Sequence, residues 1–112
     1  MYPVTPIDTQ MLKGILPMVI LAQLSSAESY GYELVTALAS SGIQVSTGTV
    51  YPLLTRLETE GKVTSRLVAS DQGPARKYYR TTPTGDAFLA AHREGWAALT
   101  AAVGAIMKGS QP

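Results

Sequence analysis

The 112-residue chain contains no cysteine and only one histidine. Without cysteine it can form neither a disulfide nor a thiolate metal site, and a lone histidine cannot supply a metal cluster. We therefore expect no metal and no cofactor. The absence of cysteine is also compatible with a reducing compartment, so a cytoplasmic protein is expected.

Motifs that carry catalysis are missing as well. No serine lies in a nucleophile elbow, and no glycine-rich phosphate loop follows a predicted strand. The glutamates Glu28, Glu33, Glu58 and Glu60 are scattered, and the last two face different ways on their helix. The sequence therefore predicts a protein that is not an enzyme.

Long apolar runs and charged residues are both scarce. Gly14, Pro17 and Gln23 interrupt the most apolar stretch, residues 11–27, so no run approaches the ~20 residues of a membrane span. The N-terminus has no basic region followed by an apolar block, so we expect neither a signal peptide nor a membrane partner. Charged residues make up 15% of the chain, against ~25% in ordinary domains. This low charge suggests that some apolar surface faces another chain.

The charge that is present is unevenly distributed. Residues 62–81 hold five basic residues and one acidic residue, although the formal charge of the whole chain is only +1. The basic residues are Lys62, Arg66, Arg76, Lys77 and Arg80. A concentrated basic segment of this kind favours contact with nucleic acid.

Directly before it, residues 46–63 (STGTVYPLLTRLETEGKV) have the pattern of a short amphipathic helix. The spacing predicts one buried face, made by Val50, Leu53, Leu54 and Leu57. Ser46 or Thr47 can cap its start, and Gly61 can end it. The opposite face carries hydroxyls, a phenol and a guanidinium from Thr49, Tyr51, Thr55, Arg56 and Thr59. One buried face and a free face of hydrogen-bonding groups are typical of a DNA recognition helix.

The preceding residues predict two more helices. Residues 1–8 are expected to form a flexible arm, and 9–25 a helix that either starts near Gly14 or bends at Pro17. A second helix is expected over 31–40, after a turn at 26–33. Its apolar side would hold Tyr32, Val35, Leu38 and Ala39. Residues 43–45 allow only a tiny strand or an extended connector.

A hairpin and a long helix follow. Strands are predicted over 62–68 and 76–82, around a turn that contains Asp-Gln-Gly-Pro, with Tyr79 facing the core. Thr82 and Pro83 then begin a helix that runs to about Lys108, and 109–112 form a tail. The order of elements predicts a mainly α (α+β) fold: a winged helix-turn-helix over 9–82 with a dimerisation helix over 83–108.

The last helix carries a seam of apolar and aromatic residues at coiled-coil spacing. The seam consists of Leu89, His92, Trp96, Leu99, Val103 and Ile106. Gly95, Ala98 and Ala102 beside it would allow a close approach. Because so small a core has no obvious place for this helix, we expect the seam to pack against a second copy of the chain, with Leu89, Trp96, Leu99, Val103 and Ile106 in the dimer interface.

Three segments together carry a family resemblance: YGYEL at 30–34, GTVYPLLTRLETEGKV at 48–63 and RKYYRTTPTGDAFL at 76–89. In this order they resemble the PadR-like transcriptional regulators, in the compact subgroup with a single C-terminal dimerisation helix. The resemblance implies a homodimer whose two recognition helices enter successive major grooves of a palindromic operator. It also implies repression that a ligand near the dimer helices relieves, with target genes for phenolic-acid detoxification or multidrug export.

The expected DNA contacts lie in the helix over 46–63 and in the hairpin. Thr49 and Tyr51 can meet bases or phosphates, and Arg56 a phosphate. The hairpin can reach the DNA backbone through Arg76 and Lys77. The full predicted set is Ser46, Thr47, Thr49, Tyr51, Pro52, Arg56, Arg76 and Lys77. The alternatives are a solvated helix face with Tyr51 packed on a neighbouring loop, and hairpin cations that only prevent edge-to-edge strand pairing.

A possible effector site is centred on Trp96. Some compact relatives carry a tryptophan on this helix that faces the dimer cleft and stacks on flat aromatic drugs, and Trp96 lies at the matching place. His92 and Leu99 flank it on the seam. Trp96 could instead stack only on its twin, and His92 could be structural.

Two other functions fit the same sequence. A winged helix can serve as a protein-interaction module without operator binding, with its apolar last helix as the docking surface. The chain could also be a small-molecule binding or sequestering protein. Preference for a palindrome and a steep salt dependence would distinguish a regulator from both.

Overall fold

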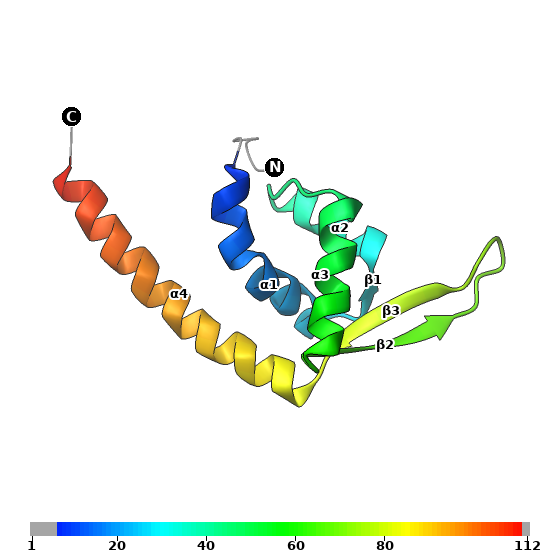
Figure 1. The fold of residues 1–112 in the computed structure, drawn as a ribbon. Coiled ribbons are helices and arrows are strands. Elements are labelled where there is room, and N and C mark those ends of the chain that lie inside the picture. Colours follow the sequence, from blue (N-terminus) through cyan, green and yellow to red (C-terminus); the bar gives the residue numbers. More distant parts are fainter. Residues whose placement is uncertain (1–6, 111–112) are drawn as a thin grey trace.

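The computed structural model describes residues 7–110 and shows a mainly helical protein with a small antiparallel sheet (Figure 1). Most of the arm predicted over 1–8, and residues 111–112 of the tail, lie outside the described residues. The elements are α1 (Thr9–Ser26), β1 (Ser29–Tyr30), α2 (Gly31–Ser40), α3 (Thr47–Thr59), β2 (Val63–Val68), β3 (Arg76–Thr81) and α4 (Pro83–Gly109). The predicted fold class, a winged helix-turn-helix followed by a long helix, is confirmed.

The core lies where α1, α2 and α3 meet the inner face of the sheet. Ile20 and Leu21 of α1, Leu34 of α2, and Leu54 of α3 are fully buried there. From the sheet, Tyr79 is buried as predicted. Because each helix contributes one apolar stripe, the polar face of every helix remains outside.

Helix α1 starts at Thr9 and continues through Pro17, so the predicted bend is the correct alternative to a later start. Asp8 caps the helix, since its Oδ1 accepts hydrogen bonds from the backbone N–H groups of Gln10 (2.7 Å) and Met11 (3.3 Å). Pro17 has no N–H to donate to the carbonyl of Lys13. The helix changes direction halfway along its length (Figure 1).

The third strand lies where the sequence indicated a turn. Residues 43–45 form no strand; Ser29 and Tyr30 pair instead with Tyr79 and Tyr78 of β3, which gives the strand order β1-β3-β2. A two-residue strand has no alternation to detect, and only β3 beside it defines it. The buried residues of α2 are Gly31, Leu34 and Leu38, whereas Tyr32, expected on the apolar side, is exposed.

The end of α3 has a defined backbone geometry. The N–H of Lys62 donates to the carbonyl of Leu57 (2.9 Å), and the N–H of Gly61 to that of Glu58 (3.0 Å). This pair of bonds is a Schellman motif, which requires a left-handed residue after the last turn. Gly61 provides it with φ of +75°. The chain is thereby turned from α3 directly into β2.

Helix α4 is joined to this turn at its first residues. Thr82 caps the helix by accepting from the N–H of Gly85 (3.0 Å), and its hydroxyl donates to the carbonyl of Gly61 (2.6 Å). Its own N–H donates to the carbonyl of Lys62 (3.1 Å). Gly85 lies so close that an added Cβ would be 1.9 Å from the Lys62 carbonyl oxygen. The start of α4 is therefore fixed to the end of α3.

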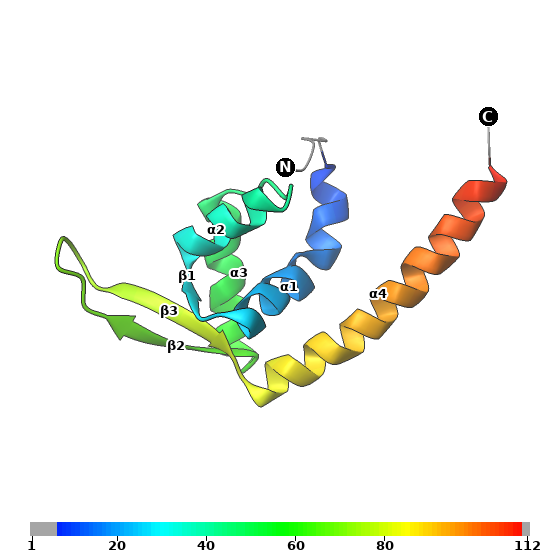
Figure 2. The same ribbon diagram turned by 180° about the vertical axis from the view of Figure 1, so that it is seen from behind.

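Beyond this joint α4 leaves the rest of the subunit (Figures 1 and 2). Only Gly85 and Leu89 are buried among the 27 residues of α4, all of which are described. The expectation that Leu89 lies in a dimer interface needs correction, because Leu89 belongs to the subunit's own core. The radius of gyration is 15.9 Å, against about 13 Å for a compact chain of this length.

Among the described residues, no helix is both long enough and apolar enough to cross a bilayer.

Replacing Gly85 by alanine tests the joint. We expect Gly85→Ala to lower the free energy of unfolding by about 1–3 kcal/mol, because the new methyl group overlaps a backbone carbonyl. Gly48→Ala is the matched control: Gly48 also lies in the first turn of a helix, and its added Cβ meets only Ser46 Oγ at 3.6 Å. Thermal unfolding of both variants measures the difference. Equal stability would contradict the close contact.

Candidate nucleic-acid interface

The predicted recognition surface is formed by the N-terminal half of α3. Val50, Leu54 and Leu57 are buried and Leu53 packs against the core, so the polar residues between them face outward. All six residues predicted for DNA contact on or just before this helix are exposed: Ser46, Thr47, Thr49, Tyr51, Pro52 and Arg56. A single helix thus presents hydroxyls, a phenol and a guanidinium on one side.

At the start of α3, Ser46 occupies the N-cap position but does not bond the helix backbone through its side chain. Its Oγ instead lies 3.3 Å from Oγ1 of Thr49, so the two hydroxyls form a pair at the helix N-terminus. Arg56 extends one turn past Pro52 and is only loosely paired, since its Nε is 3.9 Å from Glu60 Oε2. These groups remain available to hydrogen-bond a ligand.

Tyr51 is packed on one side and exposed on the other. Its ring packs against the backbone of Gly31 at the start of α2, where an added Cβ would lie 2.3 Å from Tyr51 Cε1. The side chain nevertheless remains 45% exposed. The missing side chain of Gly31 therefore leaves room for the Tyr51 ring beside α2.

Lys13 of α1 belongs to the same surface and is missing from the predicted set. It lines a groove of roughly 450 Å³ between α1 and α3, together with Thr49, Pro52 and Arg56. Lys13 is the only basic residue before Arg56 in the sequence. That isolation is a signal, but only the tertiary structure places Lys13 beside α3.

In the hairpin, Arg76 lies on the outer face of the sheet. Its guanidinium lies over the ring of Tyr30 of β1, 4.6 Å from the ring centroid. Tyr30 in turn packs edge-on against Tyr78, with centroids 5.2 Å apart. No carboxylate within the described residues pairs with Arg76. Arg76 is therefore oriented by aromatic rings and keeps its charge free.

Three other cations of the basic segment are paired with glutamates from elsewhere in the chain. Arg66 forms two bonds with Glu28, at 2.6 and 2.9 Å. Lys77 lies 3.2 Å from Glu58, and Lys62 lies 2.9 Å from Glu60. The positive charge that the sequence concentrates in residues 62–81 is thus partly neutralised in the folded protein.

These pairs also shift the acidity of the carboxyl groups. The hydrogen bonds from Arg66 lower the pKa of Glu28 below its ordinary value. The Ser65 hydroxyl and the Lys77 ammonium do the same for the pKa of Glu58, and Lys62 for the pKa of Glu60. All three carboxylates are therefore ionised at neutral pH, so each pair keeps both of its charges there.

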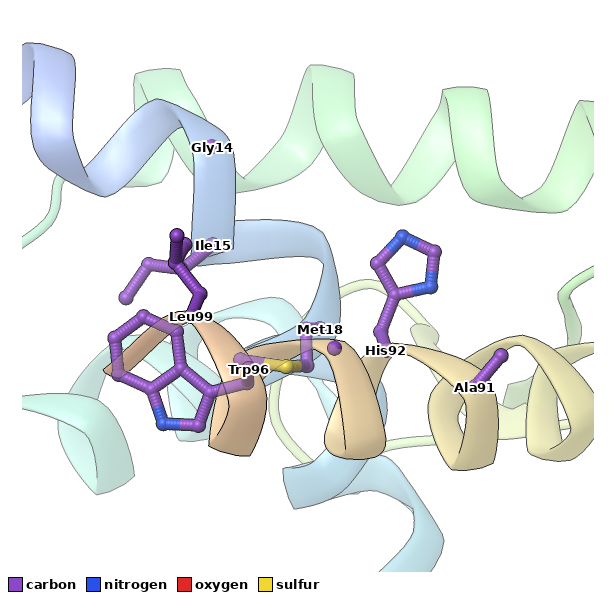
Figure 3. Close-up of a pocket in the computed structure, with 8 residues that line it drawn as sticks. Gly14, Ile15, Met18, Ala91, His92, Trp96 and Leu99 are labelled. Carbon is purple, nitrogen blue, oxygen red and sulfur yellow. The ribbon is translucent and has the colours of Figure 1, made fainter. Parts of the chain in front are cut away.

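The predicted effector residues line a shallow groove between α1 and α4. Its volume is roughly 290 Å³, and Trp96 and Leu99 face Ile15 and Met18 across it (Figure 3). His92 lies at one end of the groove. Its ring stacks on Phe88 with centroids 3.7 Å apart, and Nδ1 lies 3.0 Å from the Phe88 carbonyl oxygen. Because that oxygen can only accept, His92 is bonded to its own helix.

The sequence matches a known protein family. The model of the Transcriptional regulator PadR-like family matches residues 20–91. A transcriptional regulator of Mycobacterium tuberculosis is 42% identical over 74 residues, which are 66% of this chain and 68% of that protein.

Solved structures agree with the sequence match. A PadR-like transcriptional regulator from Bacillus cereus has a TM-score of 0.82 and 41% identity, covering 91% of this chain and 100% of its own. A PadR family transcriptional regulator from Eggerthella lenta has a TM-score of 0.81 and 38% identity, covering 88% of this chain and 86% of its own. The chain therefore belongs to the PadR-like family and is a DNA-binding transcriptional regulator, not an enzyme.

Proposed function

We propose that this regulator is a homodimeric repressor that binds a palindromic operator and is released by a flat aromatic effector. The observation that carries the proposal is the uncovered apolar side of α4. Trp96, Leu99, Val103 and Ile106 are 42–70% exposed, although they follow one another at coiled-coil spacing. An apolar stripe of this length is unfavourable in water, and a second copy of the chain would cover it.

Helix α1 extends this apolar surface. Ile7, Met11 and Ile15 line a cleft of roughly 760 Å³ opposite Leu99 and Val103 of α4. Helices α1 and α4 diverge from each other (Figures 1 and 2), and the residues that line the cleft come from both sides of that gap. Its apolar lining suits the α4 helix of a partner, so the interface would use α1 as well as α4.

In such a dimer each subunit would place its α3 in a major groove. A helix there contacts base edges through residues near its N-terminus, which in this chain are Thr49 and Tyr51. The backbone contacts would come from Arg56 and Lys13 beside the helix and from Arg76 on the hairpin. The helix then supplies sequence preference, and the cations supply affinity that depends on salt.

Release by an effector would act through α4 and its joint to α3. A ligand stacked on Trp96 between the two α4 helices would favour a dimer with a different separation of subunits. Because Thr82 and Gly85 fix the start of α4 to the end of α3, a rotation of α4 also moves α3. The spacing of the two recognition helices would then no longer match the operator.

Two alanine variants test the division of DNA contacts. We expect Arg76→Ala to weaken binding to a palindrome from the protein's own promoter and to a random duplex alike, because a phosphate contact carries no sequence information. Thr49→Ala should weaken binding to the palindrome several-fold and leave the random duplex nearly unchanged. Fluorescence anisotropy at several salt concentrations measures both. Equal losses of affinity on both duplexes for Thr49→Ala would contradict the assignment of sequence preference to Thr49.

A charge on the seam tests the dimer. We expect Ile106→Glu to raise the dimer dissociation constant by about two orders of magnitude, since it removes a side chain that the proposed dimer would bury, worth ~2–3 kcal/mol, and introduces a charge. Ala101→Glu is the control, because Ala101 lies on the opposite side of the same helix. Sedimentation at several protein concentrations gives both constants. A monomeric wild-type protein would refute the proposal.

Tryptophan fluorescence tests the effector. We expect at least one member of a panel of planar aromatic compounds to quench the emission of Trp96 and to lower operator affinity over the same concentration range. Trp96→Ala should keep operator binding and lose its response to that compound. If operator affinity and fluorescence both ignore the whole panel, this part of the proposal fails.

A further inference from the structure

Glu58 has an unusual place among the carboxylates around the hairpin. It lies near the end of α3, and its two oxygens are bound by two different strands. Oε2 accepts a hydrogen bond from the hydroxyl of Ser65 on β2 (2.5 Å), and Oε1 lies 3.2 Å from Nζ of Lys77 on β3. One side chain of the recognition helix thus ties both strands of the hairpin to that helix.

Lys77 is held from a second side as well. Its ammonium lies 5.6 Å from the centroid of the Tyr79 ring, on the inner face of the same strand. Glu58 raises the pKa of Lys77, while Ser65 and Lys77 together lower the pKa of Glu58. The lysine is therefore paired with Glu58 in the free protein, although the sequence places it beside the hairpin tip.

The neighbouring cations differ. Arg76 points to the other face of β3, where it meets Tyr30 and has no carboxylate among the described residues. Arg80 lies four residues further along β3 on the same outer face. It likewise forms no ion pair within 4.0 Å in the described part of the chain. Arg80 lies near enough to Glu28 to help lower the pKa of that carboxyl, but Glu28 is bonded to Arg66. A phosphate that approaches the hairpin therefore meets two guanidinium groups that form no ion pair and one ammonium that is already bound.

We propose that Glu58 is a positioning residue that keeps Lys77 away from DNA, so that the hairpin contacts phosphates through Arg76 and Arg80 alone. This rests on the proposed operator binding. Withholding one cation per subunit weakens attraction to any duplex but leaves the contacts of α3 intact. Glu58 thereby raises the ratio of operator affinity to non-specific affinity.

Glu58→Gln tests the proposal against a matched control, Glu60→Gln. Glutamine keeps an acceptor for Ser65 but no longer holds the ammonium by charge. Glu60→Gln removes the same charge two residues away, but its partner Lys62 remains seated over the Phe88 ring, 3.9 Å from its centroid. Both variants are compared with wild type on a promoter palindrome and on a random duplex of equal length, across a salt series, after thermal unfolding has shown them folded.

We expect Glu58→Gln to bind the random duplex about three- to tenfold more tightly at low salt. Its plot of log affinity against log salt should steepen by about 0.9 per subunit bound, the value for one further phosphate contact. The gain on the palindrome should be smaller, so the specificity ratio falls. Glu60→Gln should keep the wild-type slope. Equal changes in slope for the two variants would overturn the proposal.

Lys77→Gln provides the second readout. In the wild-type background it should leave the salt slope unchanged, because Lys77 does not reach a phosphate. In the Glu58→Gln background it should return the steeper slope to the wild-type value. A slope that falls by about 0.9 in the wild-type background would overturn the proposal while leaving operator binding in place. If the wild-type protein binds neither duplex, operator binding itself fails, and this proposal fails with it.

Discussion

The joint between the end of α3 and the start of α4 is the constraint on which the rest of the structure depends. Thr82 bonds the carbonyl of Gly61 and caps α4 at the same time, and Gly85 lies against the carbonyl of Lys62 with no room for a methyl group. Each bond is modest, about 0.5–1.5 kcal/mol. Together they join α3, the helix proposed to face DNA, directly to α4, the helix that carries the uncovered seam.

This arrangement explains how so small a chain can combine two surfaces. The core belongs almost wholly to α1, α2, α3 and the sheet, and α4 adds only Leu89 to it. The remaining turns of α4 are free to bind a second copy, while their direction is fixed by the joint. In the proposed dimer, a small rotation between the two α4 helices becomes a displacement of the two α3 helices, because no flexible linker separates them.

The electrostatics are less simple than the charge pattern suggests. The basic segment looks uniformly positive, yet glutamates from before β1 and from the end of α3 bind Arg66, Lys77 and Lys62. The cations left free are those on the outer face of β3. A regulator gains from this distribution, because excess positive charge strengthens binding to every duplex and so reduces the preference for one.

The sequence by itself determined the order of the helices, the hairpin, the cap at Thr82 and the exposed face of α3, because periodicity, caps and turn residues act locally. It left open where the first helix begins. It also indicated the family, through motifs that are contiguous. Only the tertiary structure decided the pairing of β1 with β3, the burial of Leu89, the place of Lys13 beside α3 and the neutralisation of Lys77. Each of these depends on residues far apart in the chain, such as Glu28 and Arg66, and no local pattern records which distant side chain will arrive beside another.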